Sequence, residues 1–194
     1  MNPRSFGSAG QTAQLPANMN IQLLFGQLQE RFGEAAVKVV PDALDPWIEV
    51  AAEPLERIAR FLKTESAWQF DLLNCITAVD YFEPDAKKAA KTGWEPHLEV
   101  LYHLSSTVRK HRCLLKVTLP RWRNGESGQL PELPTLSHVW RTADWHEREV
   151  YDLMGIQFIG HPDLRRILCP EDWVGHPLRK DYEMPLEYHG IRNR

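Results

Sequence analysis

The sequence predicts an α+β fold: a mainly antiparallel sheet with helices packed on one face, followed by a further helix and an extended C-terminal tail. Three observations support this prediction. Two N-terminal stretches repeat apolar residues every three or four positions, which is typical of amphipathic helices. Several short stretches in the middle of the chain show the alternation and the β-branched residues of strands. The last part is rich in proline and poor in apolar runs, which favours an extended path.

The composition limits the function classes. The chain has 194 residues, of which 43% are hydrophobic, and this is enough to bury the core of one domain with extensions. The net charge of -3 and the isoelectric point of about 6.2 give no general attraction for nucleic acid or anionic lipid. The sequence has no apolar run of about 18 residues and no secretory signal. We therefore expect a cytosolic or matrix-like protein.

Cysteine and histidine spacing argues against a metal or cluster site in this chain. Cys75, Cys113 and Cys169 lie far apart and form no CxxC pair, whereas iron–sulfur and structural zinc sites place their ligands close together. His146 and Glu147 begin like the zinc-protease motif HExxH, but position 150 is valine. We expect reduced thiols and no cofactor bound by this chain.

We divide the chain into a disordered tail at 1–18, an α+β domain at 19–134 and a C-terminal part at 135–194. The domain begins with a helix whose apolar stripe runs from Ile21 to Phe32 and ends at Gly33. Two β-like runs, 35–40 and 47–52, flank turn residues and predict a hairpin. A second helix follows Pro54, with an apolar stripe from Leu55 to Leu62.

Three longer strands are expected at 70–79, 98–104 and 112–119. In the third, Cys113, Leu115, Val117 and Leu119 alternate with more polar residues and predict the core face. The loop at 83–96 is long for a hairpin connection and is expected to be exposed. The loop at 121–133 is polar and is expected to be solvated, although arginines flank its Trp122.

A charged helix is predicted between Thr142, as its N-cap, and Gly155, as its stop. A helical wheel centred on the apolar Trp145 and Leu153 points Glu149 inward, and it points Glu147, Arg148 and Asp152 outward, with the last two paired. A buried Glu149 needs cationic partners. The candidates are His161, Arg165, Arg166, Arg179 and Lys180. We favour a structural ion pair for Glu149 over a catalytic role.

The segment that follows this helix cannot form a compact core alone. Its large side chains, Leu168, Trp173, Leu178 and Tyr182, need either the domain surface or a partner to pack on. We favour a partner, because the segment is long and the local sequence offers little to pack against.

These residues resemble a known family. Glu147, Arg148 and Glu149 are followed at fixed spacing by an acid, two apolar residues, a histidine, a basic residue and two further apolar residues. In this sequence those positions are Asp152, Leu153, Met154, His161, Arg165, Ile167 and Leu168. Together with PEDWVGHPLRKDY downstream, they resemble the thirty-kilodalton subunit, designated C, of respiratory NADH-quinone oxidoreductase, complex I. The match is tight from Pro134 to Tyr182.

The resemblance implies a scaffold subunit of the hydrophilic arm, non-catalytic alone but part of a proton-translocating enzyme. It implies contact with the forty-nine-kilodalton quinone-site subunit, designated D, and with the iron–sulfur subunits in an obligate hetero-oligomer, with FMN and clusters held by partners. It implies a peripheral position on the cytoplasmic side of the cell membrane, or the equivalent position in an organelle. The family motif suggests a structural or interface role for eleven residues: Glu147, Arg148, Glu149, Asp152, His161, Arg165, Trp173, His176, Arg179, Asp181 and Tyr182.

Three alternatives stay open. Related membrane-bound hydrogenase and formate-hydrogenlyase complexes, and plastoquinone oxidoreductases, contain similar subunits. An autonomous enzyme would need Glu149, His161 and an arginine to converge in a pocket. An RNA-binding module would need a basic surface, which the net charge disfavours.

Overall fold

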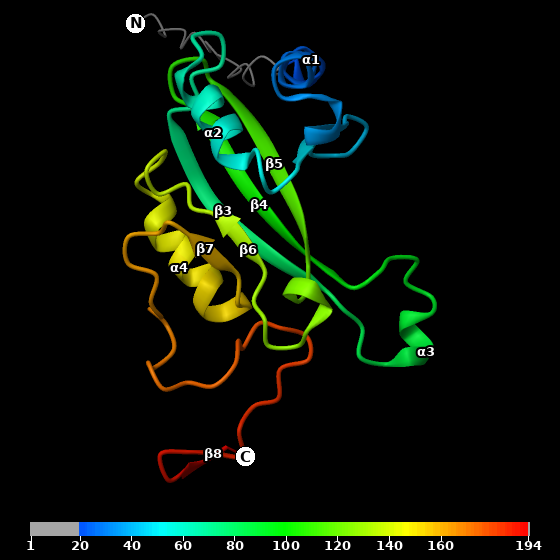
Figure 1. Cartoon of the computed structure of the whole chain (residues 1–194), viewed down its shortest axis with the longest axis vertical. Coiled ribbons are helices and arrows are strands. Elements are labelled where there is room, and N and C mark those ends of the chain that lie inside the picture. The colour runs from blue at the N-terminus through cyan, green and yellow to red at the C-terminus, as the bar shows by residue number, and fades with distance from the viewer. Residues whose placement is uncertain (1–19, 194) are drawn as a thin grey trace, which may run out of the picture.

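The structure is a computed structural model that describes residues 20–193. The tail expected at 1–18 lies outside the described residues. The chain folds as α+β around a mixed five-stranded sheet (Figure 1), which confirms the predicted class. Within residues 20–193, no helix combines the length and the apolar character needed to cross a bilayer.

The sheet combines a two-stranded hairpin with a three-stranded meander. Three of its four pairings are antiparallel, and the fourth, β2 with β5, is parallel. The predicted N-terminal hairpin is confirmed, with Val37 opposite Val50. The strand order across the sheet is β1 (Val37–Val40), β2 (Trp47–Val50), β5 (His111–Pro120), β4 (His97–Ser106) and β3 (Leu72–Tyr81).

The two N-terminal helices lie where their apolar stripes predict. Helix α1 (Ile21–Phe32) is capped by the side chain of Asn20, which accepts a hydrogen bond from the Leu23 N–H. It ends at Gly33, whose φ of 94° is accessible to glycine at little cost. Helix α2 (Leu55–Thr64) buries four side chains of its stripe: Leu55, Ile58, Ala59 and Leu62.

A single hydrophobic core joins these helices to one face of the sheet. Cys113, Leu115, Val117 and Leu119 of β5 are buried, which confirms the predicted core face of this strand. In β4, Leu98, Val100, Tyr102 and Leu104 lie opposite them in register and belong to the same core. Helix α4 (Ala143–Met154) adds Val150 and Met154, so three helices share this core.

The connections contain short elements. The loop 83–96 is largely exposed, as predicted, and carries the short helix α3 (Ala86–Ala89), which projects from the sheet (Figure 1). The prediction of a fully solvated loop at 121–133 is wrong at both ends. Arg121 is 7% exposed, and β6 (Glu132–Pro134) pairs in parallel with β7 (Gln157–Ile159). The remaining elements are the 3-10 turns η1 (Glu34–Ala36) and η2 (Arg123–Gly125) and the C-terminal strands β8 (Glu187–Tyr188) and β9 (Ile191–Arg192).

Helix α4 ends as the sequence predicts. Gly155 takes a left-handed conformation with a φ of 65°, and its N–H closes the last turn on the Tyr151 carbonyl. A Cβ at this position would clash with the ring of His176. Glycine is therefore required both by the backbone and by the close approach of the C-terminal segment.

Candidate functional site

The charged residues of α4 face the opposite way from the prediction. Glu147 and Arg148 are buried, whereas the side chain of Glu149 is 50% exposed and Trp145 is 64% exposed. The predicted pair of Arg148 and Asp152 is also wrong, because each has other partners. The wheel failed because it was centred on Trp145, a large apolar residue that lies on the solvent side.

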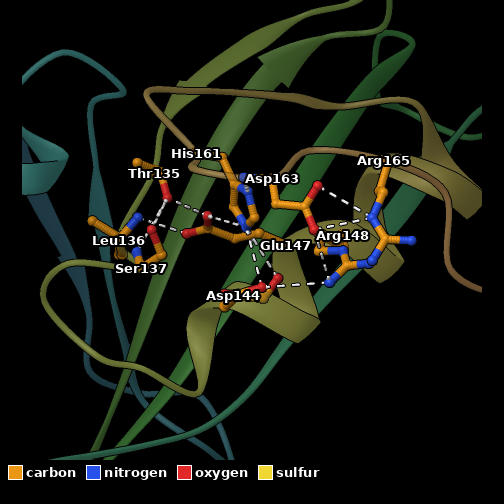
Figure 2. Close-up of polar contacts among 9 residues, drawn as sticks. All are labelled: Thr135, Leu136, Ser137, Asp144, Glu147, Arg148, His161, Asp163 and Arg165. Atoms are coloured by element: carbon orange, nitrogen blue, oxygen red, sulfur yellow. Dashed lines mark hydrogen bonds and ion pairs between the residues drawn. The ribbon is translucent and has the colours of Figure 1, made fainter.

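Glu147 is a fully buried carboxyl group that holds the chain entering α4 (Figure 2). It accepts hydrogen bonds from the Thr135 hydroxyl, at 2.5 Å, and from the Leu136 N–H, at 2.6 Å. Burial raises the pKa of Glu147 to about 7, against the effect of these two hydrogen bonds and with a further contribution from Asp144. Glu147 thus fixes the residues that follow β6.

His161 is held by hydrogen bonds on both ring nitrogens, and its side chain has no exposed surface. The Asp163 N–H donates to Nδ1 at 3.0 Å, which places the ring proton on Nε2. The Nε2–H group of His161 donates to the carbonyl oxygen of Asp144 at 3.1 Å, and Nε2 lies 4.0 Å from Glu147 Oε2. His161 therefore ties the loop after β7 to the first turn of α4, as Figure 2 shows.

Arg148 lies beside this loop with only 6% of its side chain exposed. Its Nη1 is 3.8 Å from Asp144 Oδ1 and 3.7 Å from Asp163 Oδ2. Arg165, itself 69% exposed, donates to both oxygens of Asp163, and this interaction lowers the pKa of Asp163. The result is an alternating row of two carboxylates and two guanidinium groups (Figure 2).

Asp152 anchors the start of the C-terminal segment. Its Oδ2 accepts three consecutive backbone N–H groups, those of Ile167, Leu168 and Cys169, at 3.0, 2.8 and 2.9 Å. Its Oδ1 accepts from Arg166 Nη1 at 2.6 Å. Burial alone would raise the pKa of Asp152, but these donors outweigh burial and hold the pKa below its usual value.

Arg179 and Arg121 fasten the far end of the segment. Arg179 donates to the carbonyl oxygens of Met154, Gly155 and Arg121 at 2.5, 3.1 and 2.9 Å, and burial lowers its pKa to about 10. Arg121 pairs with Asp80 of β3 and with Asp181, each at 2.7 Å. Asp80 and Arg121 were not predicted as site residues from the sequence. Asp80 lies on the core-facing side of β3, since it pairs with the buried Leu98 of β4. The alternation of residues along the strand could therefore have identified it.

The other motif residues lie along the same segment. His176 is half-buried, with Nδ1 2.9 Å from the Asp152 carbonyl oxygen, and Trp173 packs on Tyr188 with ring centroids 4.9 Å apart. Tyr182 is half-buried over Gly175. The segment is thus held on its own domain at Asp152, Arg179 and Asp181, while Leu168 and Leu178, two of the four side chains expected to need a packing partner, stay exposed. Backbone N–H and carbonyl groups, which a residue pattern does not show, provide much of this docking.

Six apolar side chains of this segment are left exposed, and we call them the exposed apolar set. Their exposed fractions run from 57% for Leu178 to 85% for Val174 and Leu186. The set consists of Leu168, Val174, Leu178, Met184, Leu186 and Ile191. Apolar side chains that form a contiguous exposed patch are typical of surfaces that bind other proteins, and this set is the candidate for such a surface.

The buried polar groups of the site bond within the chain. Asp152 and Arg179 bond mainly to backbone groups, whereas Glu147 bonds to one hydroxyl group and one backbone N–H. A shallow cavity of about 230 Å³ lies beside α4, lined by Ser137, His138, Arg141, Asp144 and Pro162. Within the described part of the chain, no three His, Cys, Asp or Glu side chains are grouped to hold a metal ion.

Comparisons with known proteins agree on one family. The family described as "Respiratory-chain NADH dehydrogenase, 30 Kd subunit" matches residues 48–188. The chain is similar to the NADH-quinone oxidoreductase subunit designated C from Geobacter sulfurreducens, at 42% identity over 81% of this chain and 86% of the relative. The subunit of the same name from Chlorobium phaeobacteroides is 40% identical over 85% of this chain and 90% of the relative. That of Chloroherpeton thalassium is 36% identical over 88% of this chain, which spans 64% of that relative.

Proposed function

The chain belongs to the family of the 30 Kd subunit of respiratory-chain NADH dehydrogenase, and from this premise we propose that it is a structural subunit of a proton-translocating NADH-quinone oxidoreductase. It binds no redox group. FMN and iron–sulfur clusters in neighbouring subunits carry the electrons from NADH to quinone. The chain holds those neighbours in place.

The proposed partners are the quinone-site subunit and the iron–sulfur subunits of the hydrophilic arm. The chain associates with the cytoplasmic face of the membrane through these partners. Its interface is the C-terminal segment, where the exposed apolar set supplies the area that a stable interface buries.

One observation carries this proposal: two charged groups, Asp152 of α4 and Arg179 of the C-terminal segment, are bonded to the chain's own backbone. Asp152 accepts from three consecutive N–H groups, and Arg179 donates to three carbonyl oxygens. Groups engaged in this way are not free to bind a substrate or to exchange protons with one. They support an architectural role, in which charge fixes a segment whose apolar side chains face outward.

The test is a pull-down of the tagged chain from its own membranes in mild detergent, with mass spectrometry of the partners. We expect the quinone-site subunit together with the NADH-binding flavin subunit. A nickel–iron hydrogenase partner would instead identify the related hydrogenase assembly. The purified chain alone should show no NADH or quinone turnover, and turnover by the chain alone would refute the structural role.

A further inference from the structure

Arg148 differs from the buried Arg121 and Arg179 and from the half-buried Arg166 in its hydrogen bonding. Arg121, Arg166 and Arg179 each donate three hydrogen bonds to described residues. The Nε of Arg148 is buried and has no hydrogen-bond partner among residues 20–193. The carboxylate oxygens that face its Nη1, at 3.7 and 3.8 Å, lie beyond hydrogen-bonding distance. A guanidinium group with a 6% exposed side chain is thus left with unused donors.

The guanidinium group needs an acceptor within reach, not a further negative charge. Asp144 Oδ1 is itself buried without a hydrogen-bond partner among residues 20–193, but at 3.8 Å from Nη1 it is too far away to accept. Asp144 and Asp163 already flank the guanidinium group and compensate its charge, and Asp163 is shared with Arg165. A buried donor without an acceptor is costly, and native structures contain few of them. A further carboxylate would be repelled by the two present, so an uncharged oxygen is the favoured acceptor.

The surface beside Arg148 is also unusual. Trp145, one turn earlier on α4, is 64% exposed, and its ring lies 4.9 Å from the guanidinium carbon of Arg148. Tryptophan and arginine are the residue types most enriched where binding energy concentrates in interfaces. An exposed aromatic ring therefore adjoins a buried cation with unused donors.

We propose that Trp145 and Arg148 form a contact site for another subunit of the complex, one that presents main-chain carbonyl oxygens, as the C-terminal end of a helix does. These oxygens accept from the guanidinium group, and an apolar side chain of the same segment packs on Trp145. This contact site is separate from the exposed apolar set. The inference rests on the proposed function, since it requires a partner subunit.

The test is a competition between subunits in one cell. Tagged wild-type chain and an untagged variant are expressed together, and mass spectrometry measures their ratio in the purified membrane complex relative to the lysate. We expect Arg148→Met to be incorporated about tenfold less than wild type, which corresponds to about 1.4 kcal/mol. The isolated variant should unfold at the wild-type temperature or above, because methionine keeps the buried stem and Asp144 and Asp163 stay partly solvated, at 36% and 52% exposed.

Further variants separate the explanations. Arg148→Lys keeps the charge but loses the planar fork, so it should be incorporated as poorly as Arg148→Met. Trp145→Ala removes an exposed ring and should lower incorporation without lowering stability. Arg60→Met removes a 54% exposed arginine that pairs with Glu56 on α2, and this control should compete as the wild type does.

Three outcomes would overturn the proposal. Equal incorporation of Arg148→Met and wild type would show that no partner uses the guanidinium group. Full incorporation of Arg148→Lys would show that simple charge attraction, not a contact with carbonyl oxygens, holds the partner. Loss of folding in Arg148→Met with normal incorporation of Trp145→Ala would assign Arg148 an internal role. If the wild type itself did not enter such a complex, the proposed function would fail instead.

Discussion

At the scale of single residues, Glu147 couples the stability of the chain to pH. Its pKa is raised from 4.5 to about 7 by burial. Between these values the folded chain holds a proton that the unfolded chain releases, so this contribution to stability is complete below about pH 4.5 and is lost as the pH rises to about 7. The Glu147→Gln side chain does not exchange this proton. Its amide oxygen can accept from the Leu136 N–H, and its amide nitrogen can donate to the Thr135 hydroxyl oxygen.

We therefore predict that the stability of Glu147→Gln relative to wild type increases by up to about 3 kcal/mol as the pH rises through this range. Denaturant unfolding of both chains at several pH values measures the difference. Glu149→Gln, which alters the half-exposed acid of the same helix, is the matched control. A pH-independent difference for Glu147→Gln would contradict a buried, proton-linked carboxyl group.

At the scale of elements, α4 holds the C-terminal segment through Asp152. In Asp152→Asn the side chain keeps one acceptor oxygen for three N–H groups and leaves Arg166 without its carboxylate. Removing one member of a buried pair costs about 3 to 5 kcal/mol. We expect fast hydrogen exchange at Ile167, Leu168 and Cys169 in the variant and slow exchange in the wild type. Unchanged protection at these amides would show that the segment is held by other contacts.

The same scale shows what a local pattern can predict. Helices α1, α2 and α4 and the five strands of the main sheet were predicted because each has its own periodicity. The parallel pair of β6 and β7 was missed, because strands of three residues have almost no period and their pairing joins distant parts of the chain. The strands β2 and β5 were both predicted, but their parallel contact was missed because it joins distant parts of the chain.

The candidate site was predicted only in part. Glu147, Asp152 and Arg179 were named, but Asp80 and Arg121 were not, and the geometry was not predicted. The spacing from Glu147 to Leu168 identified the family, since a motif is a property of sequence. It did not tell which glutamate is buried, because the outcome depends on Thr135, Leu136 and His161, which pack on α4 from other elements. A wheel drawn for one helix contains none of these neighbours.

At the scale of the whole molecule, charged side chains link the sheet, the loop after β5 and the C-terminal segment. Asp80 from the sheet, Arg121 from the following loop and Asp181 from the C-terminal segment meet in one ion-pair group. Asp80 also accepts from the Lys180 N–H at 2.9 Å. This group fixes the segment across the end of the sheet (Figure 1), and the chain beyond it carries the last three members of the exposed apolar set: Met184, Leu186 and Ile191.

The central claim is that the domain presents this segment to partner subunits, and oxidative footprinting tests it most directly. Side-chain oxidation rates are measured in the isolated chain and in the purified membrane complex. We predict that Val174, Met184 and Leu186 react readily in the isolated chain and are strongly protected in the complex, more than Leu44 and Val108, which are exposed in the sheet domain. Equal rates for the exposed apolar set in both samples would contradict the account.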